Sequence, residues 1–153
     1  MKVLELKIPP VALTIIIAFL MWGFAELFPA TKFSSVWNIV IASAVSCIGV
    51  IFSLLGVLEF KKEKTTVDPR VPDQTSSLVI TGVYTLSRNP MYIGFLFMLI
   101  AWAFYLSQIL VFVFLPLFII YMNWFQITPE ERFMMQKFGE EYTLYMAKVR
   151  RWI

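Results

Sequence analysis

The sequence predicts an all-α integral membrane protein with about four transmembrane helices, the last two forming a tight hairpin, and a C-terminal amphipathic helix. Of its 153 residues, 59% are hydrophobic and 15% are charged, whereas soluble domains contain about 45–50% and about 25%. The mean hydropathy is +0.77. Basic residues gather on one side of the apolar segments. We therefore expect one membrane domain over residues 1–153.

Four apolar segments are expected to cross the membrane, at about residues 11–28, 36–58, 91–105 and 109–127. A helix needs roughly 17–25 residues for this. Pro9 and Pro10 open the first segment, and proline suits the first turn of a helix. The third and fourth segments share one apolar run that is split at Tyr105–Gln108, which predicts the hairpin. The third segment is short, so we expect it to tilt or to span only part of the bilayer.

The second segment carries small residues at spacings of 4, 3, 4 and 3, which place them on one helix face. Such a stripe lets two membrane helices approach closely. We therefore predict helix packing in preference to a ligand groove for Ala42, Ser46, Gly49, Ser53 and Gly56.

The distribution of Lys and Arg predicts the orientation, because cytosolic loops carry an excess of both. One side would hold both termini and the loop 59–90, which contains Pro69 and Pro72, and the other side holds only Lys32. We expect both termini in the cytoplasm and a prokaryotic inner (plasma) membrane as the location. Trp22, Trp37 and Trp102 would mark the outer interface, and Trp124 and Trp152 the inner one. The basic side holds Lys2, Lys7, Lys61, Lys62, Lys64, Arg70, Arg88, Arg132, Lys137, Lys148, Arg150 and Arg151.

The segment after Thr128 differs in character from the four spans. Thr128 to Glu131, with Pro129 at the first helical position, forms a capping-box pattern and predicts a helix over residues 129–149. Its apolar residues recur at helical spacing, which indicates an amphipathic helix on the membrane surface or against the core. The stripe consists of Met134, Phe138, Tyr142, Tyr145 and Val149.

The composition excludes several functional classes. The chain has one cysteine, Cys47, and no histidine, so we expect no zinc or haem site and no other metal. No basic stripe with interleaved aromatic residues suggests nucleic acid as a partner. The Gly-rich strand-turn-helix pattern of a Rossmann domain is also missing from the sequence.

Polar residues gather at the basic end of the predicted hairpin. Arg88, Asn89 and Tyr92 begin the third span, and a second group ends the fourth. A hairpin brings the start of the third span and the end of the fourth together. Polar groups are costly at membrane depth, so their presence there indicates a function. A cationic Arg beside carboxylates, covered by aromatic rings, suits a polar cofactor. The second group consists of Asn123, Gln126, Glu130 and Glu131.

Each of these residues also has a simpler interpretation. Arg88 suits a topology anchor that extends to lipid headgroups. Asn89 and Pro90 suit the N-cap and first position of a helix. The Glu pair suits the capping box and the helix dipole, and Asn123 and Gln126 suit hydrogen bonds between helices.

The ordered set of motifs resembles the isoprenylcysteine carboxyl methyltransferase and phospholipid N-methyltransferase superfamily. The resemblance covers about residues 65 to 153, and the set is more specific than any one member. The matching residues are Thr81–Tyr84, then Arg88–Gly94, then Glu130 and Glu131, then Phe138–Tyr142, then Tyr145 and Val149.

The resemblance implies an integral membrane methyltransferase that uses S-adenosylmethionine and methylates a lipophilic small molecule or a lipid, with membrane lipids as partners. Arg88, Glu131 and Gln126 are then nominated as catalytic. Glu131 would pair with the cofactor's ammonium group, Arg88 with its carboxylate, and Tyr84 or Tyr92 would face the sulfonium. The cofactor-binding set carried over is Tyr84, Arg88, Asn89, Tyr92, Gly94, Glu130, Glu131 and Tyr142.

Two positions depart from the family pattern. Asn89 stands where the family usually has His, and an amide forms hydrogen bonds but does not titrate. Gln126 stands where the prenylcysteine-specific members have Arg. A neutral amide is a poor partner for a buried carboxylate, which counts against prenylcysteine and leaves a phospholipid amine, a small thiol or another lipophilic acceptor.

Two other functional classes remain open at this stage. Membrane sterol reductases share a similar Arg-His-Pro-x-Tyr segment and bind NADPH, but they generally have more spans than this chain supplies. A non-enzymatic tetraspan membrane protein is the other alternative, because Asn89 replaces the family His.

Overall fold

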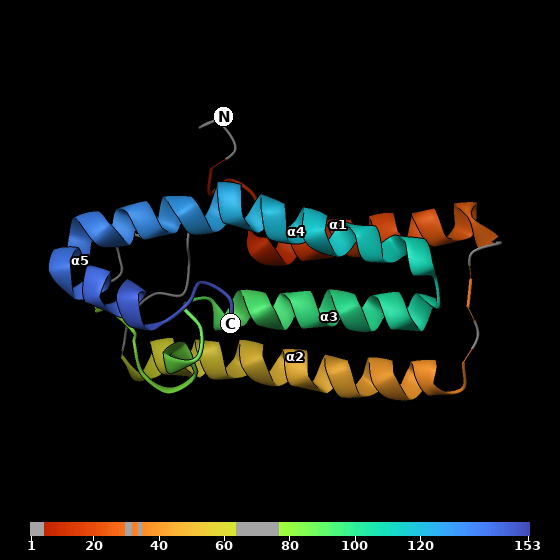
Figure 1. Cartoon of the computed structure of the whole chain (residues 1–153), viewed down its shortest axis with the longest axis horizontal. Coiled ribbons are helices and arrows are strands. Elements are labelled where there is room, and N and C mark those ends of the chain that lie inside the picture. Colours follow the sequence, from red (N-terminus) through yellow and green to blue (C-terminus); the bar gives the residue numbers. More distant parts are fainter. Residues whose placement is uncertain (1–4, 30–31, 34, 64–76) are drawn as a thin grey trace.

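A computed structural model describes residues 5–29, 32–33, 35–63 and 77–153 of the chain. Helices dominate these residues and no named strand is found among them, which confirms the predicted all-α membrane fold (Figure 1). The elements are α1 (Pro10–Leu27), α2 (Trp37–Lys62), the 3₁₀ helix η4 (Gly82–Thr85), α3 (Pro90–Leu106), the 3₁₀ helix η5 (Ile109–Val113), α4 (Phe114–Tyr121), the π-helix η6 (Met122–Ile127) and α5 (Thr128–Lys148).

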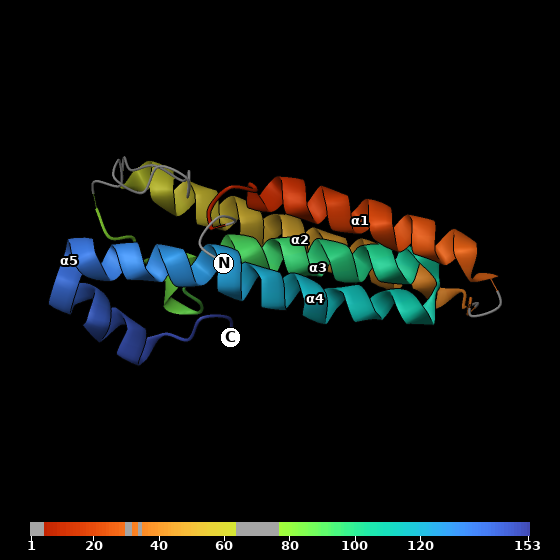
Figure 2. The ribbon, with the colours of Figure 1, turned by 90° about the horizontal axis from the view of Figure 1, so that it is seen from above.

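The four long apolar segments lie side by side along the long axis of the molecule, as Figures 1 and 2 show from two directions. Pro10–Leu27, Trp37–Lys62 and the continuous helical run Ile109–Lys148 are each long and apolar enough to cross a membrane. The α3 helix, with 17 residues, is shorter. At about 1.5 Å per residue it is roughly 25 Å long, so it is the short arm of the hairpin with α4.

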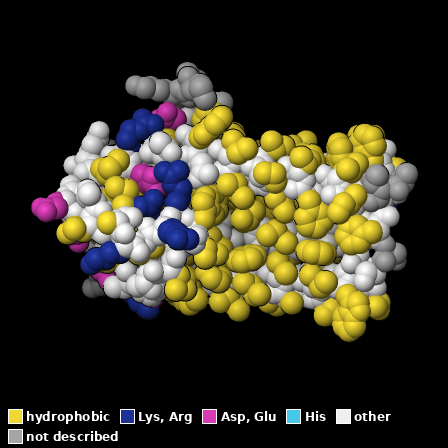
Figure 3. Space-filling view, viewed as in Figure 1, with side chains coloured by type: hydrophobic (Ala, Val, Ile, Leu, Met, Phe, Trp, Pro, Cys, Tyr) yellow, Lys and Arg dark blue, Asp and Glu magenta, His cyan; other side chains and the backbone are white. Residues whose placement is uncertain are grey.

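The core between these helices is filled by α1, α3 and α4. Met21, Ala103 and Phe118 are fully buried there. In contrast, outward-facing residues such as Phe19 are largely exposed, and Figure 3 shows hydrophobic side chains covering the length of the bundle. An exposed apolar surface of this extent is suited to lipid, and the chain is an integral membrane protein.

Glycine residues set the close packing of α2 against α3. A Cβ atom at Gly49 would lie 2.7 Å from the backbone oxygen of Gly94, and one at Gly56 would lie 2.5 Å from the Met91 side chain. Ala42, Gly49 and Gly56 are buried. The small residues of α2 therefore serve helix packing, as their spacing predicted.

The connection between α3 and α4 is a tight turn anchored to both other helices. Ser107 has a left-handed conformation (φ 53°) that ends α3, and its Oγ accepts a 2.8 Å hydrogen bond from Asn38 Nδ2 of α2. Gln108 accepts a bond from the backbone N–H of Leu110 and donates one to the Phe28 carbonyl at the end of α1. The predicted hairpin is confirmed, and its turn holds one end of the bundle together.

The opposite end of the bundle, where Arg88 pairs with Glu131, is the polar end, and Figure 3 shows that the Lys, Arg, Asp and Glu side chains visible on this face gather there. The chain before α1 also lies here, because the Leu6 N–H donates to the Phe125 carbonyl at 2.9 Å. Lys32 lies at the other end, where it pairs with Glu26. The predicted basic-side residues Lys2, Lys64 and Arg70, with Pro69 and Pro72 of the loop, lie outside the described residues.

The capping box predicted at Thr128 is wrong. Thr128 has helical dihedral angles and continues directly from η6, and no side chain caps the start of α5. Since the helix does not begin here, no free N–H groups need a cap. The helix changes direction at Gly139 instead (φ 52°, ψ −120°), a conformation that suits glycine. The end of α5 consequently folds back toward the bundle (Figures 1 and 2).

Gly49→Ala is expected to lower the free energy of unfolding by about 1–3 kcal/mol, as overpacking does. The new methyl group would clash with the backbone oxygen of Gly94 in α3, which cannot move aside as a flexible side chain could. The matched control is Gly23→Ala in α1, where a Cβ would meet nothing within 4 Å and helix propensity improves by about 1 kcal/mol. Denaturant unfolding in detergent measures both, and equal stability of the two variants would contradict this packing.

Candidate functional site

The candidate site lies at the polar end, where three segments far apart in the sequence meet. Pro90 begins α3, so the preceding residues Ser87 to Asn89 form a non-helical entry to it. The π-helix η6 joins α4 to α5 and carries Asn123 and Gln126. Such wider turns often occur at functional positions. The residues after α5 complete the group.

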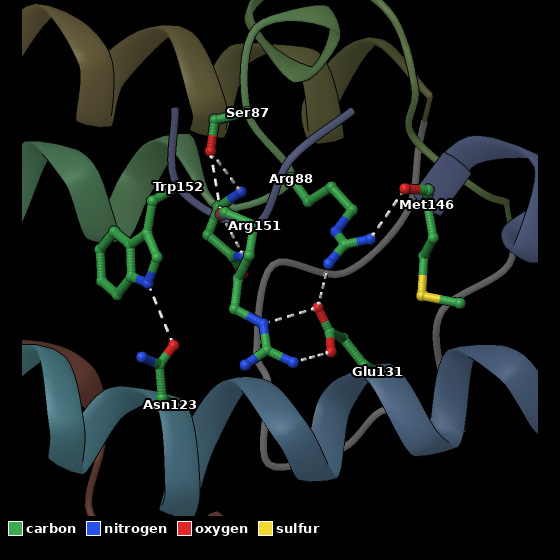
Figure 4. A network of polar contacts seen from close by, with 8 residues as sticks. Ser87, Arg88, Asn123, Glu131, Met146, Arg151 and Trp152 are labelled. Atoms are coloured by element: carbon green, nitrogen blue, oxygen red, sulfur yellow. Dashed lines mark hydrogen bonds and ion pairs between the residues drawn. The ribbon is translucent and has the colours of Figure 1, made fainter. Parts of the chain in front are cut away.

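The Glu131 carboxylate lies between two guanidinium groups (Figure 4). Arg88 Nη2 donates to Glu131 Oε1 at 2.7 Å, and Arg151 donates from Nε to the same oxygen at 3.1 Å and from Nη2 to Oε2. Glu131 and Arg88 are nearly buried, whereas the Arg151 side chain is about one-third exposed. Charge-assisted bonds of this kind are roughly twice as strong as neutral ones. This triad, Arg88–Glu131–Arg151, joins α3, α5 and the C-terminus.

The residues after α5, Val149 to Ile153, lie as a strap across the entry to α3. The Arg88 N–H donates to the Arg150 carbonyl at 3.0 Å, and Asn89 Nδ2 donates to the Arg151 carbonyl at 2.8 Å. Trp152 Nε1 donates to Asn123 Oδ1 at 3.0 Å. Asn89 does occupy the N-cap position of α3, with Pro90 beginning the helix, but its side chain makes no capping hydrogen bond and its amide binds the strap instead. Figure 4 shows the strap running between α3 and α5.

A second polar group lies beside the triad. Tyr92 Oη of α3 and Gln126 Nε2 of η6 both donate to Glu130 Oε1, at 2.6 and 2.5 Å. Tyr92 and Gln126 are buried. Glu130 lies beyond Ile127, where the fourth apolar segment ends, and burial raises the pKa of its carboxyl from 4.5 to about 7. Glu130 therefore titrates near neutral pH.

Two of the predicted tyrosines are buried against this site. Tyr84 of η4 is 4% exposed, and its hydroxyl has no hydrogen-bond partner among the described residues. Its carbonyl accepts a 2.7 Å hydrogen bond from Tyr145 Oη of α5. Tyr142 is also buried, and burial raises the pKa of both Tyr84 and Tyr142 above 10. Tyr145 thus joins α5 to η4, and its ring centroid lies 6.1 Å from that of Tyr142.

The structure brings most of the predicted site residues together, with one exception and one addition. Gly94 lies in the α2–α3 contact against Gly49 and Ser53, away from the charged groups. Arg151 was expected only as a topology charge, yet it holds Glu131. The short sequence Arg150–Trp152 has no helical or strand periodicity that could have indicated this role. The position of Arg151 depends on the turn at Gly139.

The described residues contain no group of three or more His, Cys, Asp or Glu side chains that could hold a metal ion. Instead, the site offers two cations, two carboxylates, amides and tyrosine rings. This set suits a zwitterionic organic molecule with its own ammonium and carboxylate groups.

Comparisons with known proteins place the chain in a family. Residues 37–141 match the family model described as phospholipid methyltransferase. An uncharacterized protein of Haemophilus influenzae is 43% identical over 63 residues, which are 41% of this chain and 100% of that protein. No solved structure matches.

Glu131→Gln is expected to lower the free energy of unfolding by about 3 kcal/mol, the lower limit for a broken buried ion pair, because it leaves Arg88 and Arg151 without their shared counter-charge. The matched control is Glu140→Gln in the same helix, where the exposed side chain predicts a change within about 0.5 kcal/mol. Thermal and denaturant unfolding in detergent measure this. Equal stability of both variants would show that the triad does not hold the strap.

The raised pKa of Glu130 predicts a pH dependence of stability. The folded protein binds the Glu130 proton more tightly than the unfolded chain does. The contribution of this proton to the stability of the fold is therefore full below about pH 4.5 and is lost as the pH rises through about 7. Glu130→Gln should remove this dependence, so that the variant gains stability relative to the unmodified protein as the pH rises. Melting temperatures between about pH 5 and pH 8 measure it. Parallel curves would contradict the raised pKa.

Proposed function

Because this chain belongs to the phospholipid methyltransferase family and is a membrane methyltransferase, we propose that it uses S-adenosylmethionine and methylates a lipophilic acceptor from the bilayer. The observation that carries this proposal is the Arg88–Glu131–Arg151 triad beside Tyr92 and Glu130 at one end of the bundle. We further propose that this end faces the cytosol, because the basic residues gather there.

The chemistry of the site supports this cofactor. Arg88 Nε and the Tyr84 hydroxyl are buried without a hydrogen-bond partner among the described residues, and such groups call for a polar partner. Arg88 would bind the carboxylate of the cofactor, and Glu131 its ammonium group. Tyr84, Tyr92 or Tyr142 would face the sulfonium, as aromatic rings do with cations. Asn89 would hold the strap that closes the site.

Binding of an ammonium group at Glu131 has a consequence for the strap. Both Glu131 oxygens already accept bonds from guanidinium groups. Arg151 is the more exposed of the two arginines, so it is the one we expect to leave. The strap would then lose one of its contacts when the cofactor binds.

When bound, S-adenosylmethionine supplies an electrophilic methyl group. The protein mainly positions the acceptor in line with it. For an amine acceptor, the nitrogen forms its bond to the methyl carbon as the bond from that carbon to sulfur breaks. Glu130, with a pKa of about 7, suits the role of general base for the proton that the nitrogen loses. Gln126 is a neutral amide and therefore a poor partner for the carboxylate of an acidic acceptor. This supports an amine as the acceptor, and we propose a phospholipid amine.

Calorimetric titration of the detergent-purified protein with S-adenosylmethionine and S-adenosylhomocysteine tests the proposal. We expect micromolar binding, weakened by about 1.5–3 kcal/mol in Arg88→Ala and in Glu131→Gln through lost charge-assisted bonds. Arg132→Ala is the control, since its contact with Glu5 is long (3.5 Å) and exposed. Unchanged affinity in both site variants, or binding of NADPH instead, would overturn the proposed pocket.

Transfer of labelled methyl groups to phosphatidylethanolamine in vesicles tests the acceptor. Glu130→Gln is expected to reduce the rate at least about 100-fold, the lower end of the range for removal of a general base. Gln126→Arg should shift activity toward lipophilic acids. Equal rates for the unmodified protein and Glu130→Gln would assign the proton transfer to water.

A further inference from the structure

A cavity of about 560 Å³ lies at the end of the bundle opposite the polar end. This volume falls within the range of roughly 300–1,000 Å³ that is usual for small-molecule sites. It is open to the outside and is lined by the last turns of α1, the first turn of α2 and the end of α3, and Figure 1 shows these three segments together at one end. It is separated from the Arg88–Glu131–Arg151 triad by the length of the helices.

Three aromatic side chains form one wall of the cavity. Trp102 and Tyr105 of α3 stack with their ring centroids 5.2 Å apart and their planes at 15°, and Trp22 of α1 also lines the cavity. Trp102 is fixed by its Nε1 hydrogen bond to the Ala18 carbonyl. Rigid aromatic faces around a cavity are the recognised means of binding ammonium groups in proteins.

Polar groups complete the lining. Asn38 is 5% exposed and is oriented by its 2.8 Å bond to Ser107. Glu26 of α1 lines the cavity with a carboxylate whose side chain is 59% exposed, and Lys32 lies 3.5 Å from it. The cavity wall thus carries an accessible negative charge with a positive charge directly beside it.

The position of the cavity favours a lipid over a water-soluble ligand. Trp22 and Ile39, which both line it, are more than half exposed on the apolar outer surface of the bundle. Trp residues at the end of a membrane helix lie at the level of the lipid headgroups. A headgroup can therefore enter from the side while its chains remain in the bilayer.

We propose that this cavity binds the headgroup of a zwitterionic phospholipid from the leaflet opposite the polar end, with the ammonium against Glu26 and the aromatic wall, and the phosphate at Lys32. The adjacent charges of Glu26 and Lys32 match the adjacent, opposite charges of such a headgroup. This site is independent of the proposed methyl transfer, because it shares none of its residues.

Photo-crosslinking in nanodiscs tests the proposal. The holoprotein is reconstituted in phosphatidylglycerol with a small fraction of phosphatidylcholine that carries a photoreactive group on its headgroup, and adducts are mapped by mass spectrometry. We expect adducts on peptides that contain Trp22, Glu26 and Trp102. Unlabelled phosphatidylcholine or phosphatidylethanolamine should displace them, and added phosphatidylglycerol should not. Adducts spread evenly over the apolar surface, or equal displacement by phosphatidylglycerol, would overturn the proposal.

Variants of exposed residues make the test specific. Glu26→Gln, Lys32→Gln and Trp22→Leu are each expected to reduce the adduct yield about fivefold, the scale of one cation–π or charge contact. The matched controls are Trp37→Leu, a more exposed Trp outside the cavity lining, and Glu140→Gln at the other end. Unchanged yield in Glu26→Gln would overturn the assignment of the ammonium.

Glycerophosphocholine, which has the headgroup without the acyl chains, distinguishes a membrane phospholipid from a soluble amine as the ligand. It should displace the adducts only at far higher concentration than phosphatidylcholine. Equal potency would assign the cavity to a soluble amine and overturn the lipid proposal. Affinity for S-adenosylmethionine, measured in Glu26→Gln, should not change, so failure at this site is distinguishable from failure of the proposed function.

Discussion

The polar end of this protein depends on one negative charge. Glu131 is the shared counter-charge of Arg88 and Arg151, and a nearly buried guanidinium is tolerated only where such a partner exists. Arg88 brings the entry of α3 to α5, and Arg151 brings the C-terminal strap to the same place. The backbone bonds of the strap to Arg88 and Asn89 follow from this arrangement. One carboxylate therefore positions three segments.

The two neighbouring glutamates have different surroundings and hence different properties. Glu131 is held between cations, whereas Glu130 accepts bonds from the neutral donors Tyr92 and Gln126. Burial without a cation raises the pKa of Glu130 to about 7. Two carboxylates whose environments differ in this way are suited to different tasks: in the proposed reaction one binds a cation and the other exchanges a proton.

The apolar part of the bundle makes this site possible by holding its helices at fixed depth. The close contact at Gly49 and Gly94 holds α2 against α3, and the anchored turn at Ser107 and Gln108 fixes the far end of the hairpin. The near ends then meet at η6, whose wider turn carries Gln126 toward Glu130. The small residues of α2 thus act on the site through helix packing alone.

The sequence by itself determined the membrane class, the helical fold, the hairpin and the α2 packing stripe, because hydropathy and the spacing of small residues are local properties. Its motifs also indicated the family and grouped Arg88, Tyr92, Gln126, Glu130 and Glu131 at one end. Only the tertiary structure decided the role of Arg151, the strap contact of Asn89, the position of Gly94 in a helix contact and the missing cap at Thr128. The role of Arg151 and the strap contact of Asn89 depend on the turn at Gly139, and the missing cap follows from the continuation of α4 through η6 into α5. The strap contacts and the α2–α3 contact join segments that are far apart in the sequence, and no periodic pattern in the chain records such contacts.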